Sequence, residues 1–352
     1  MTSSTSTPGE HLAVILPQKD APMSISLRPT PEPGPNDILI EVKAIAVNIA
    51  DYYQRDQGVP PIPQYPTVLG SDVAGIVVKV GSNVSADAPQ PGARVTAFAS
   101  AFFENGLPDY GAFQQYVLAP AQAVALLPDS LSFEEAAMLP MAVLTAWDGW
   151  YVIGIPHDTK YTPEDKKAML VWGGSSSVGS AALQSAKIMG FTVYTTASAR
   201  HHEYLKQLGA DRTFDYKDAD VVAQIIQAAR DDGVSLHNAY DAVAGSLEPT
   251  MEILKELKGD AVAKIAHAAL LPPDAPTVEG IEAKFVYPPL DPVERQEYFH
   301  QTFRVWLTEK LASGQFIPSP HIQIMGGGLE GLNKALDALQ EGVSGTKIVL
   351  TL

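Results

Sequence analysis

The chain has 352 residues, of which 46% are hydrophobic and 18% are charged, so it is long enough for two domains and can bury a substantial core. Its formal net charge is −16, which disfavours nucleic acid and anionic membranes as partners. It contains no cysteine, which excludes disulfides, thiolate nucleophiles and cysteine-ligated zinc or iron–sulfur sites.

The N-terminal part of the chain has the pattern of β-strands. Its first residues lack the basic start and apolar stretch of a secretory signal, and we see no apolar run long enough to span a membrane, so we expect a soluble cytoplasmic protein. Residues 38–48 and 72–84 alternate apolar and polar side chains, as half-buried strands do. Residues 132–153 are predicted to form one helix, with Ser132 as N-cap and Glu135 in capping-box spacing.

From residue 168 onward, segments with strand and helix patterns alternate. Alternation at this spacing indicates βαβ units and therefore a parallel sheet. The tail contains one long helical pattern at 293–315, a strand at 321–324, a helix at 329–342 and a final strand at 346–352.

A glycine- and serine-rich turn lies between the first strand of the alternating part and its helix. Gly174, Ser176 and Gly179 occupy the frame of a G-x-G-x-x-G phosphate-binding turn, with serine as the middle residue. The N–H groups and dipole at the helix start favour a pyrophosphate, to which the serine hydroxyls can add donors. The turn could also be a plain connection, but its context favours a nucleotide. The predicted contacts are Gly174, Ser175, Ser176, Ser177, Val178 and Gly179.

The end of the following strand indicates which nucleotide binds. An NAD site usually places a carboxylate about 20 residues after the glycines, to hold the ribose 2′-hydroxyl. Here the strand leads into Ser198, Ala199, Arg200 and His201, and the first acid is Glu203. Because a guanidinium binds phosphate in a bidentate manner, this segment favours the 2′-phosphate of NADP(H). The alternative is that Arg200 is a solvated side chain at a helix start.

Several motifs, in one order along nearly the whole chain, resemble the medium-chain dehydrogenase/reductase superfamily. They are residues 48–55, 68–75, 92–95, 111–116, 136–140, 144–146, 206–216 and 345–350. The resemblance implies an α/β fold, with a Rossmann doubly wound parallel sheet domain at 141–309. That domain would be inserted into a GroES-like, β-rich catalytic domain formed by residues 1–140 and 310–352.

The resemblance also separates two branches of the superfamily. Zinc members carry a cysteine ligand and a Gly-His-Glu motif, whereas this chain has no cysteine and has Gly70-Ser71-Asp72 at that place. This implies the zinc-independent, quinone oxidoreductase-like branch, with no metal. Within it, residues 48–55, 169–179 and 196–218 are most similar to fungal enoyl reductases that act in trans in polyketide biosynthesis. The implied reaction is NADPH-dependent hydride transfer to the β-carbon of an α,β-unsaturated acyl thioester.

The same resemblance implies roles for individual residues. Asn48, Ala50, Asp51, Tyr53 and Thr145 would lie near the nicotinamide, with Asn48, Tyr53 and Thr145 catalytic. Tyr53 would be the proton donor or the enolate's hydrogen-bond partner, because a phenol keeps its proton at neutral pH. Trans-acting reductases can carry lysine here, and quinone reductases carry tyrosine. Asp51 could instead be a turn or cap carboxylate, and the Thr145 hydroxyl could simply bond within its own helix.

The remaining implied contacts concern the adenosine end of the cofactor and the substrate. Tyr216 resembles a residue that touches the adenosine phosphate, although it could be a core aromatic at a strand end. Val343 and Ser344 resemble a backbone contact to the cofactor. Ordinary core packing is an equal alternative for several of the residues expected to wall the substrate pocket. These residues are Met141, Ala142, Leu144, Trp147, Asp148, Ala283 and Phe285.

Two other functions stay open at the level of the sequence. One is a stand-alone NADPH:quinone or enone oxidoreductase, which Tyr53 favours, and the other is a nucleotide-binding protein without turnover. An enoyl reductase acting in trans would receive its thioester from an acyl carrier protein of a polyketide synthase. Residues 260–276 are expected near the edge strand through which quinone reductases dimerise, and the prolines there slightly favour a monomer over a homodimer.

Overall fold

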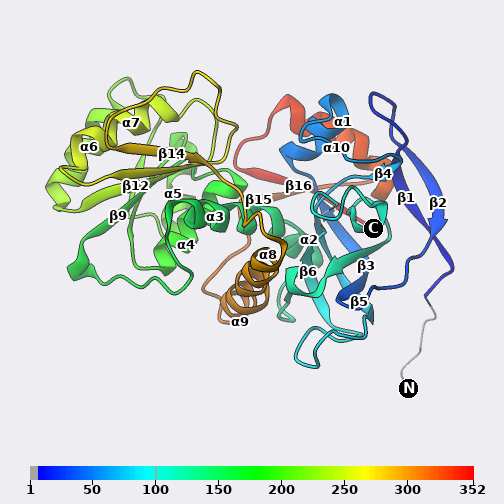
Figure 1. Ribbon diagram of the computed structural model, residues 1–352. Coiled ribbons are helices and arrows are strands. Elements are labelled where there is room, and N and C mark those ends of the chain that lie inside the picture. Colours follow the sequence, from blue (N-terminus) through cyan, green and yellow to red (C-terminus); the bar gives the residue numbers. More distant parts are fainter. Residues whose placement is uncertain (1–6, 100) are drawn as a thin grey trace.

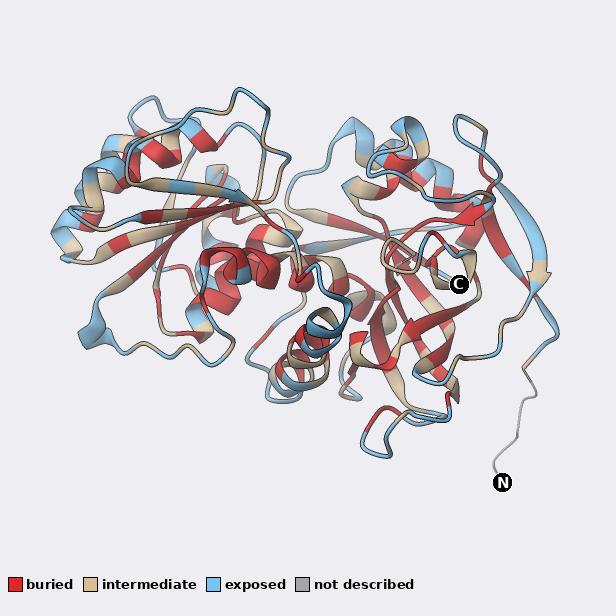
Figure 2. Cartoon of the chain, viewed as in Figure 1, coloured by how far each residue is buried: buried red, intermediate tan, exposed pale blue. Residues whose placement is uncertain are grey.

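The computed structural model describes residues 7–99 and 101–352 and contains two sheet-based units that lie side by side (Figure 1). One unit alternates strands and helices, and the other is rich in β-structure. Buried residues line the strands and the helix that connects the units, whereas the outer helices combine buried residues with exposed ones (Figure 2).

The α/β unit is built on a six-stranded parallel sheet. In chain order its strands occupy the third, second, first, fourth, fifth and sixth places, which is the doubly wound arrangement of dinucleotide-binding folds. The predicted α/β class and parallel sheet are therefore confirmed. Across the sheet the strands are β11 (Arg212–Phe214), β10 (Thr192–Thr196), β9 (Lys167–Trp172), β12 (Ser235–Asp241), β13 (Ala263–His267) and β14 (Ile281–Phe285). Its helices include α4 (Ser177–Ile188), α5 (His202–Gln207), α6 (Val221–Asp232) and α7 (Leu247–Leu257).

The β-rich unit combines strands from both ends of the chain. The final strand pairs antiparallel with β3, so Val349 lies opposite Ala46. The main sheet contains β15 (His321–Met325), β16 (Thr346–Thr351), β3 (Asp37–Ala46), β5 (Asp72–Val80), β6 (Arg94–Phe98) and β8 (Val124–Leu126), with β7 (Tyr116–Pro120) paired to β3. A smaller sheet contains β2 (Ser24–Pro29), β1 (Glu10–Leu16) and β4 (Thr67–Val68). The helices α1 (Ile49–Gln57) and α10 (Leu332–Glu341) contact each other.

The helix predicted at 132–153 is divided into two. Ser132 caps the first part, α2 (Phe133–Ala137), and forms the expected capping box with Glu135. The second part, α3 (Pro140–Ile153), begins at a proline. Because proline has no N–H to donate to the preceding turn, a single continuous helix was the wrong prediction.

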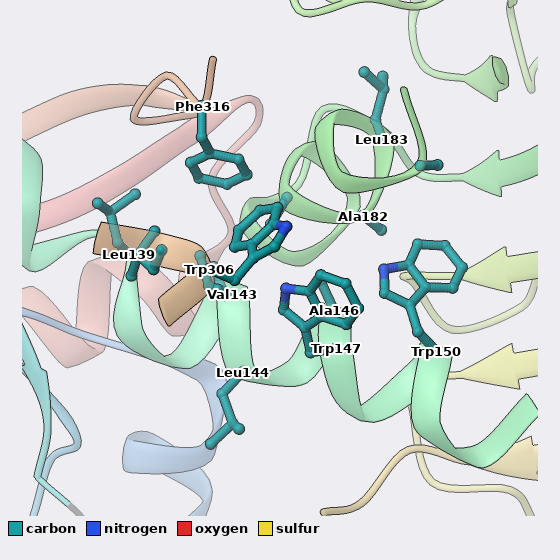
Figure 3. Packing of buried hydrophobic residues seen from close by; sticks show 14 of the residues in the cluster. Leu139, Val143, Leu144, Ala146, Trp147, Trp150, Ala182, Leu183, Trp306 and Phe316 are labelled. Atoms are coloured by element: carbon teal, nitrogen blue, oxygen red, sulfur yellow. The ribbon is translucent and has the colours of Figure 1, made fainter. Parts of the chain in front are cut away.

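The α3 helix is the apolar centre of the molecule. Trp147 and Trp150 project from it, and the Trp147 ring meets Trp306 edge to face with 5.2 Å between centroids (Figure 3). The α2–α3 stretch, residues 133–153, is long and apolar enough to cross a membrane, contrary to our expectation from the sequence. However, 83% of its most apolar window is buried, which is typical of a core helix in a soluble protein.

The end of the α/β unit also differs from the expectation. Residues 260–276 contain β13, which lies between β12 and β14, so β14 is the edge strand at that side of the sheet. The predicted helix at 293–315 forms as α8 (Pro292–Phe299), a π-helical segment η5 (His300–Leu307) and α9 (Thr308–Ala312) in direct succession.

Candidate functional site

The glycine and serine turn connects β9 to α4. Ser176 is the N-cap of α4: its Oγ accepts the N–H of Gly179 at 3.0 Å and donates to the carbonyl of Gly173 at 2.8 Å. A hydroxyl has a single proton to donate. The Ser176 hydroxyl therefore holds the turn together and has no proton left for a ligand, in contrast to the expectation that all three serines could add donors.

Two glycines of the turn are required by close packing. A Cβ at Gly174 would overlap Oγ1 of Thr195, and a Cβ at Gly179 would overlap the carbonyl oxygen of Gly173. The turn follows β9, which is flanked by β10 and β12, at the point where the strand order reverses. In doubly wound sheets the ligand lies at this point, and the first N–H groups of α4 have no intrahelical partner. The turn thus fits a pyrophosphate.

The segments expected at the adenosine end come together. Oγ of Ser198 lies 3.5 Å from the phenol oxygen of Tyr216, and Nε2 of His201 lies 3.0 Å from Oγ of Ser344. The site thus joins the carboxyl ends of β10 and β11 to the segment before β16. A carboxylate that the sequence analysis missed is also present, since Asp215 accepts the N–H of Ala199 at 3.0 Å.

The second part of the site surrounds the start of α1. Asn48 is the N-cap residue, and its side chain makes no cap bond. Instead Nδ2 of Asn48 donates to Oδ2 of Asp72 at 2.9 Å, and its Oδ1 accepts from Nζ of Lys347. Oδ1 of Asp72 accepts the N–H of Met141 at 2.6 Å, in the first turn of α3. Asp72 and Lys347 lie within motifs that the sequence analysis quoted, but neither residue was predicted to belong to the site.

Asp51 is fully buried beneath this cluster. Its Oδ2 accepts the backbone N–H of Asn48 at 2.7 Å, while its Oδ1 has no hydrogen-bond partner among the described residues. Burial raises the pKa of the Asp51 carboxyl to about 7; the Asn48 N–H opposes this rise and the nearby charge of Asp72 adds to it. Asp51 is thus both a helix-start carboxylate and a group that titrates near neutral pH.

The other residues expected at the nicotinamide end lie on α1 and α3. Tyr53 is 39% exposed, and its ring centroid lies 4.6 Å from that of Tyr52. The backbone carbonyl of Thr145 accepts a hydrogen bond from the hydroxyl of Tyr240 at 2.5 Å, which ties α3 to β12. Ala50, the second residue of α1, is partly exposed.

The residues expected to wall a substrate pocket fall into two groups. Met141, Ala283 and Phe285 are partly exposed. Trp147 is closed to solvent and stacks on His157 with 4.0 Å between ring centroids, and burial raises the pKa of Asp148 well above its ordinary value. The fully buried members of the set line the core of α3 and are Ala142, Leu144, Trp147 and Asp148.

A doubly wound sheet with a tight glycine turn at its switch point, joined to a β-rich unit, defines a nucleotide-binding oxidoreductase architecture. Two family models agree: residues 34–129 match the alcohol dehydrogenase GroES-like domain, and residues 177–262 match the zinc-binding dehydrogenase model. Across residues 7–99 and 101–352, no group of three or more histidine, aspartate or glutamate side chains is placed to hold a metal ion.

Relatives extend this match over the whole chain. The chain is 57% identical to the trans-enoyl reductase tndF of Aspergillus flavipes, over 97% of this chain and 99% of that protein. It is 59% identical to the trans-enoyl reductase tazE of Aspergillus terreus, over 81% of this chain and 95% of the relative. The chain therefore belongs to the medium-chain dehydrogenase/reductase superfamily.

Solved structures share the fold at lower identity. An alcohol dehydrogenase superfamily protein from Novosphingobium aromaticivorans aligns with a TM-score of 0.78 and 21% identity, over 97% of this chain and 99% of that one. A mycobacterial protein solved in complex with NADPH aligns with a TM-score of 0.71 and 24% identity, over 97% of this chain and all of that one.

Proposed function

We propose that this protein is an NADPH-dependent, zinc-independent enoyl reductase that acts in trans in the biosynthesis of a polyketide-type metabolite in the cytoplasm. The observation that carries the proposal is the glycine turn at the switch point of the sheet, with Ser198 and Tyr216 in contact at the next two strand ends and Arg200 two residues after Ser198. The substrate class rests on the two trans-enoyl reductases that share more than half of their residues with the chain.

The residues of the α/β unit fit the pyrophosphate and the adenosine end of NADPH. Gly174 and Gly179 let the turn pack closely against Thr195 and the Gly173 carbonyl, which shapes the start of α4 where the pyrophosphate is proposed to bind. Arg200 is exposed, with its Nε 3.2 Å from Nε2 of His201, and it supplies a guanidinium for the 2′-phosphate. The carboxylate of Asp215 accepts the backbone N–H groups of Ala199 and Lys217, one at each oxygen, and so stabilises the turn after β11.

When bound, NADPH supplies the hydride that is added to the β-carbon of the unsaturated thioester. The chain's own residues stabilise the negative charge that develops on the thioester oxygen, and they supply the proton that the α-carbon needs. Tyr53 donates a hydrogen bond or a proton from its phenol, and Asn48 retains one amide N–H that no residue of the described chain uses. Thr145, on α3, contacts the nicotinamide or the ribose.

The zinc-independent part of the proposal rests on Asp72. This residue stands where zinc members of the superfamily have the glutamate of Gly-His-Glu. Its carboxylate is fully buried and accepts hydrogen bonds from the Asn48 amide and the Met141 N–H. It also forms an ion pair with Lys347, whose Nζ lies 3.2 Å from Oδ2. Because both oxygens are occupied, the carboxylate is held as a structural anchor.

The thioester is proposed to arrive on an acyl carrier protein, and the enzyme is proposed to be a monomer. The edge strand β14 carries Glu282 and Lys284, whose charged groups lie 3.6 Å apart. Charged side chains on an edge strand oppose the pairing of that edge with a second copy.

A stand-alone quinone or enone reductase is the second candidate, and the observation that favours it is a tyrosine at position 53.

Oxidation of NADPH by crotonyl thioesters, followed at 340 nm beside simple quinones and with NADH as control, tests the proposal. We expect NADPH-dependent turnover of the thioester. Turnover of quinones alone would assign the protein to the quinone reductases. Binding of NADPH without turnover of free or carrier-bound thioester would leave a nucleotide-binding protein.

The Arg200→Gln variant tests the cofactor. Loss of a charge-assisted contact to phosphate is expected to raise the KM for NADPH by about 10- to 100-fold. The KM for NADH should stay the same, because NADH has no 2′-phosphate. Arg230→Gln is the matched control, since Arg230 is an exposed arginine that pairs with Glu256 away from the turn. An unchanged preference for NADPH in Arg200→Gln would remove Arg200 from the site.

A further inference from the structure

Lys347 is a buried cation in the last strand of the protein. The side chain is 4% exposed, and its Nζ lies 3.2 Å from Oδ2 of Asp72. The pairing of β16 with β3 brings it there: the N–H of Val47 donates to the carbonyl of Ile348, so β16 passes the point at which β3 leads into α1. A lysine that is buried to this degree needs a partner for its charge, and Asp72 is that partner.

The same ammonium group also fixes the side chain of Asn48. Lys347 donates to Oδ1 of Asn48, and Asp72 accepts from Nδ2. Lysine can only donate and a carboxylate can only accept, so the amide of Asn48 has one permitted orientation. In that orientation one N–H of Asn48 has no partner among the described residues, and rotation of the amide by 180° would set two donors against each other.

Asp72 also binds the first turn of a second helix, α3. Its other oxygen accepts the N–H of Met141 at 2.6 Å, in the first turn of α3. The pair of Lys347 and Asp72 therefore ties the start of α1, the start of α3 and the end of β16 to one buried point. Asn48, Tyr53 and Thr145 project from the helices that are held in this way.

We propose that Lys347 is a positioning residue for hydride transfer, which directs the remaining N–H of Asn48 and, through Asp72, ties the start of α1 to the start of α3. This inference rests on the proposed function, because it requires Asn48 to face the reacting end of the cofactor. The competing explanation is that the ion pair only stabilises the fold.

The variants Lys347→Met, Lys347→Arg and the double variant Lys347→Met/Asp72→Asn separate these explanations. Three quantities are measured: the melting temperature, the Kd for NADPH by fluorescence titration, and the kcat for crotonyl thioester. Lys347→Met leaves Asp72 buried and unpaired, so its melting temperature should fall. The double variant removes both charges and should regain much of that stability.

The kcat values of these variants separate a positioning role of Lys347 from a purely structural one. If Lys347 positions Asn48, kcat in the double variant stays about 10- to 100-fold below wild type although stability returns, since small misplacements cost that much. Lys347→Arg, which keeps a donor and a charge, should recover most of the rate, and the Kd for NADPH should change less than kcat. A double variant with both stability and kcat restored would overturn the positioning role. A wild-type protein that does not reduce the thioester would overturn the proposed function itself, and the inference with it.

Discussion

Replacement of Gly174 by alanine is expected to weaken NADPH binding by about 10- to 100-fold, the size of effect that overpacking of a tight site produces. The added methyl group would overlap Oγ1 of Thr195 on the neighbouring strand. That oxygen cannot move away freely, because it is buried and donates to the carbonyl of Val171 at 2.8 Å. The turn would have to open at the point where the pyrophosphate is proposed to bind.

Fluorescence titration with NADPH at fixed salt measures the effect, beside the melting temperature. Gly326→Ala is the matched control, since an added Cβ there meets nothing within 4 Å. The double variant Gly174→Ala/Thr195→Ala removes the obstructing oxygen and should recover part of the affinity. Wild-type affinity in Gly174→Ala would show that the turn does not hold the cofactor.

Replacement of Tyr53 by phenylalanine is expected to lower kcat for thioester reduction by about 100- to 10,000-fold, which is the contribution of a positioned general acid. The ring of Tyr53 is 39% exposed on α1, and its centroid lies 4.6 Å from that of Tyr52. Removal of the hydroxyl should therefore leave the melting temperature and the Kd for NADPH unchanged.

Tyr52→Phe is the matched control, because Tyr52 is the adjacent phenol and packs against the core of the β-rich unit. Single-turnover measurement of NADPH oxidation separates the chemical step from product release. Loss of activity in Tyr52→Phe with full activity in Tyr53→Phe would assign the proton to the neighbouring residue. Equal rates in all three proteins would indicate that water supplies it.

Short-range patterns in the sequence were sufficient for much of the fold. The alternation of strands and helices predicted the parallel sheet, and the frame of Gly174, Ser176 and Gly179 located the turn at its switch point. Ser132 and Glu135 marked a helix start correctly, because a capping box is formed by residues only three positions apart. Such signals depend on local geometry, which a few neighbouring residues determine.

The tertiary structure decided everything that depends on distant partners. Asn48 and Lys347 are 299 positions apart, and His201 and Ser344 are 143 apart, so no local pattern could pair them. The same limit explains the error about the edge strand, because strand order is set by the whole sheet. The sequence alone indicated the family and the position of the glycine turn. The buried charges that fix Asn48 became apparent only when β16 was seen to pair with β3.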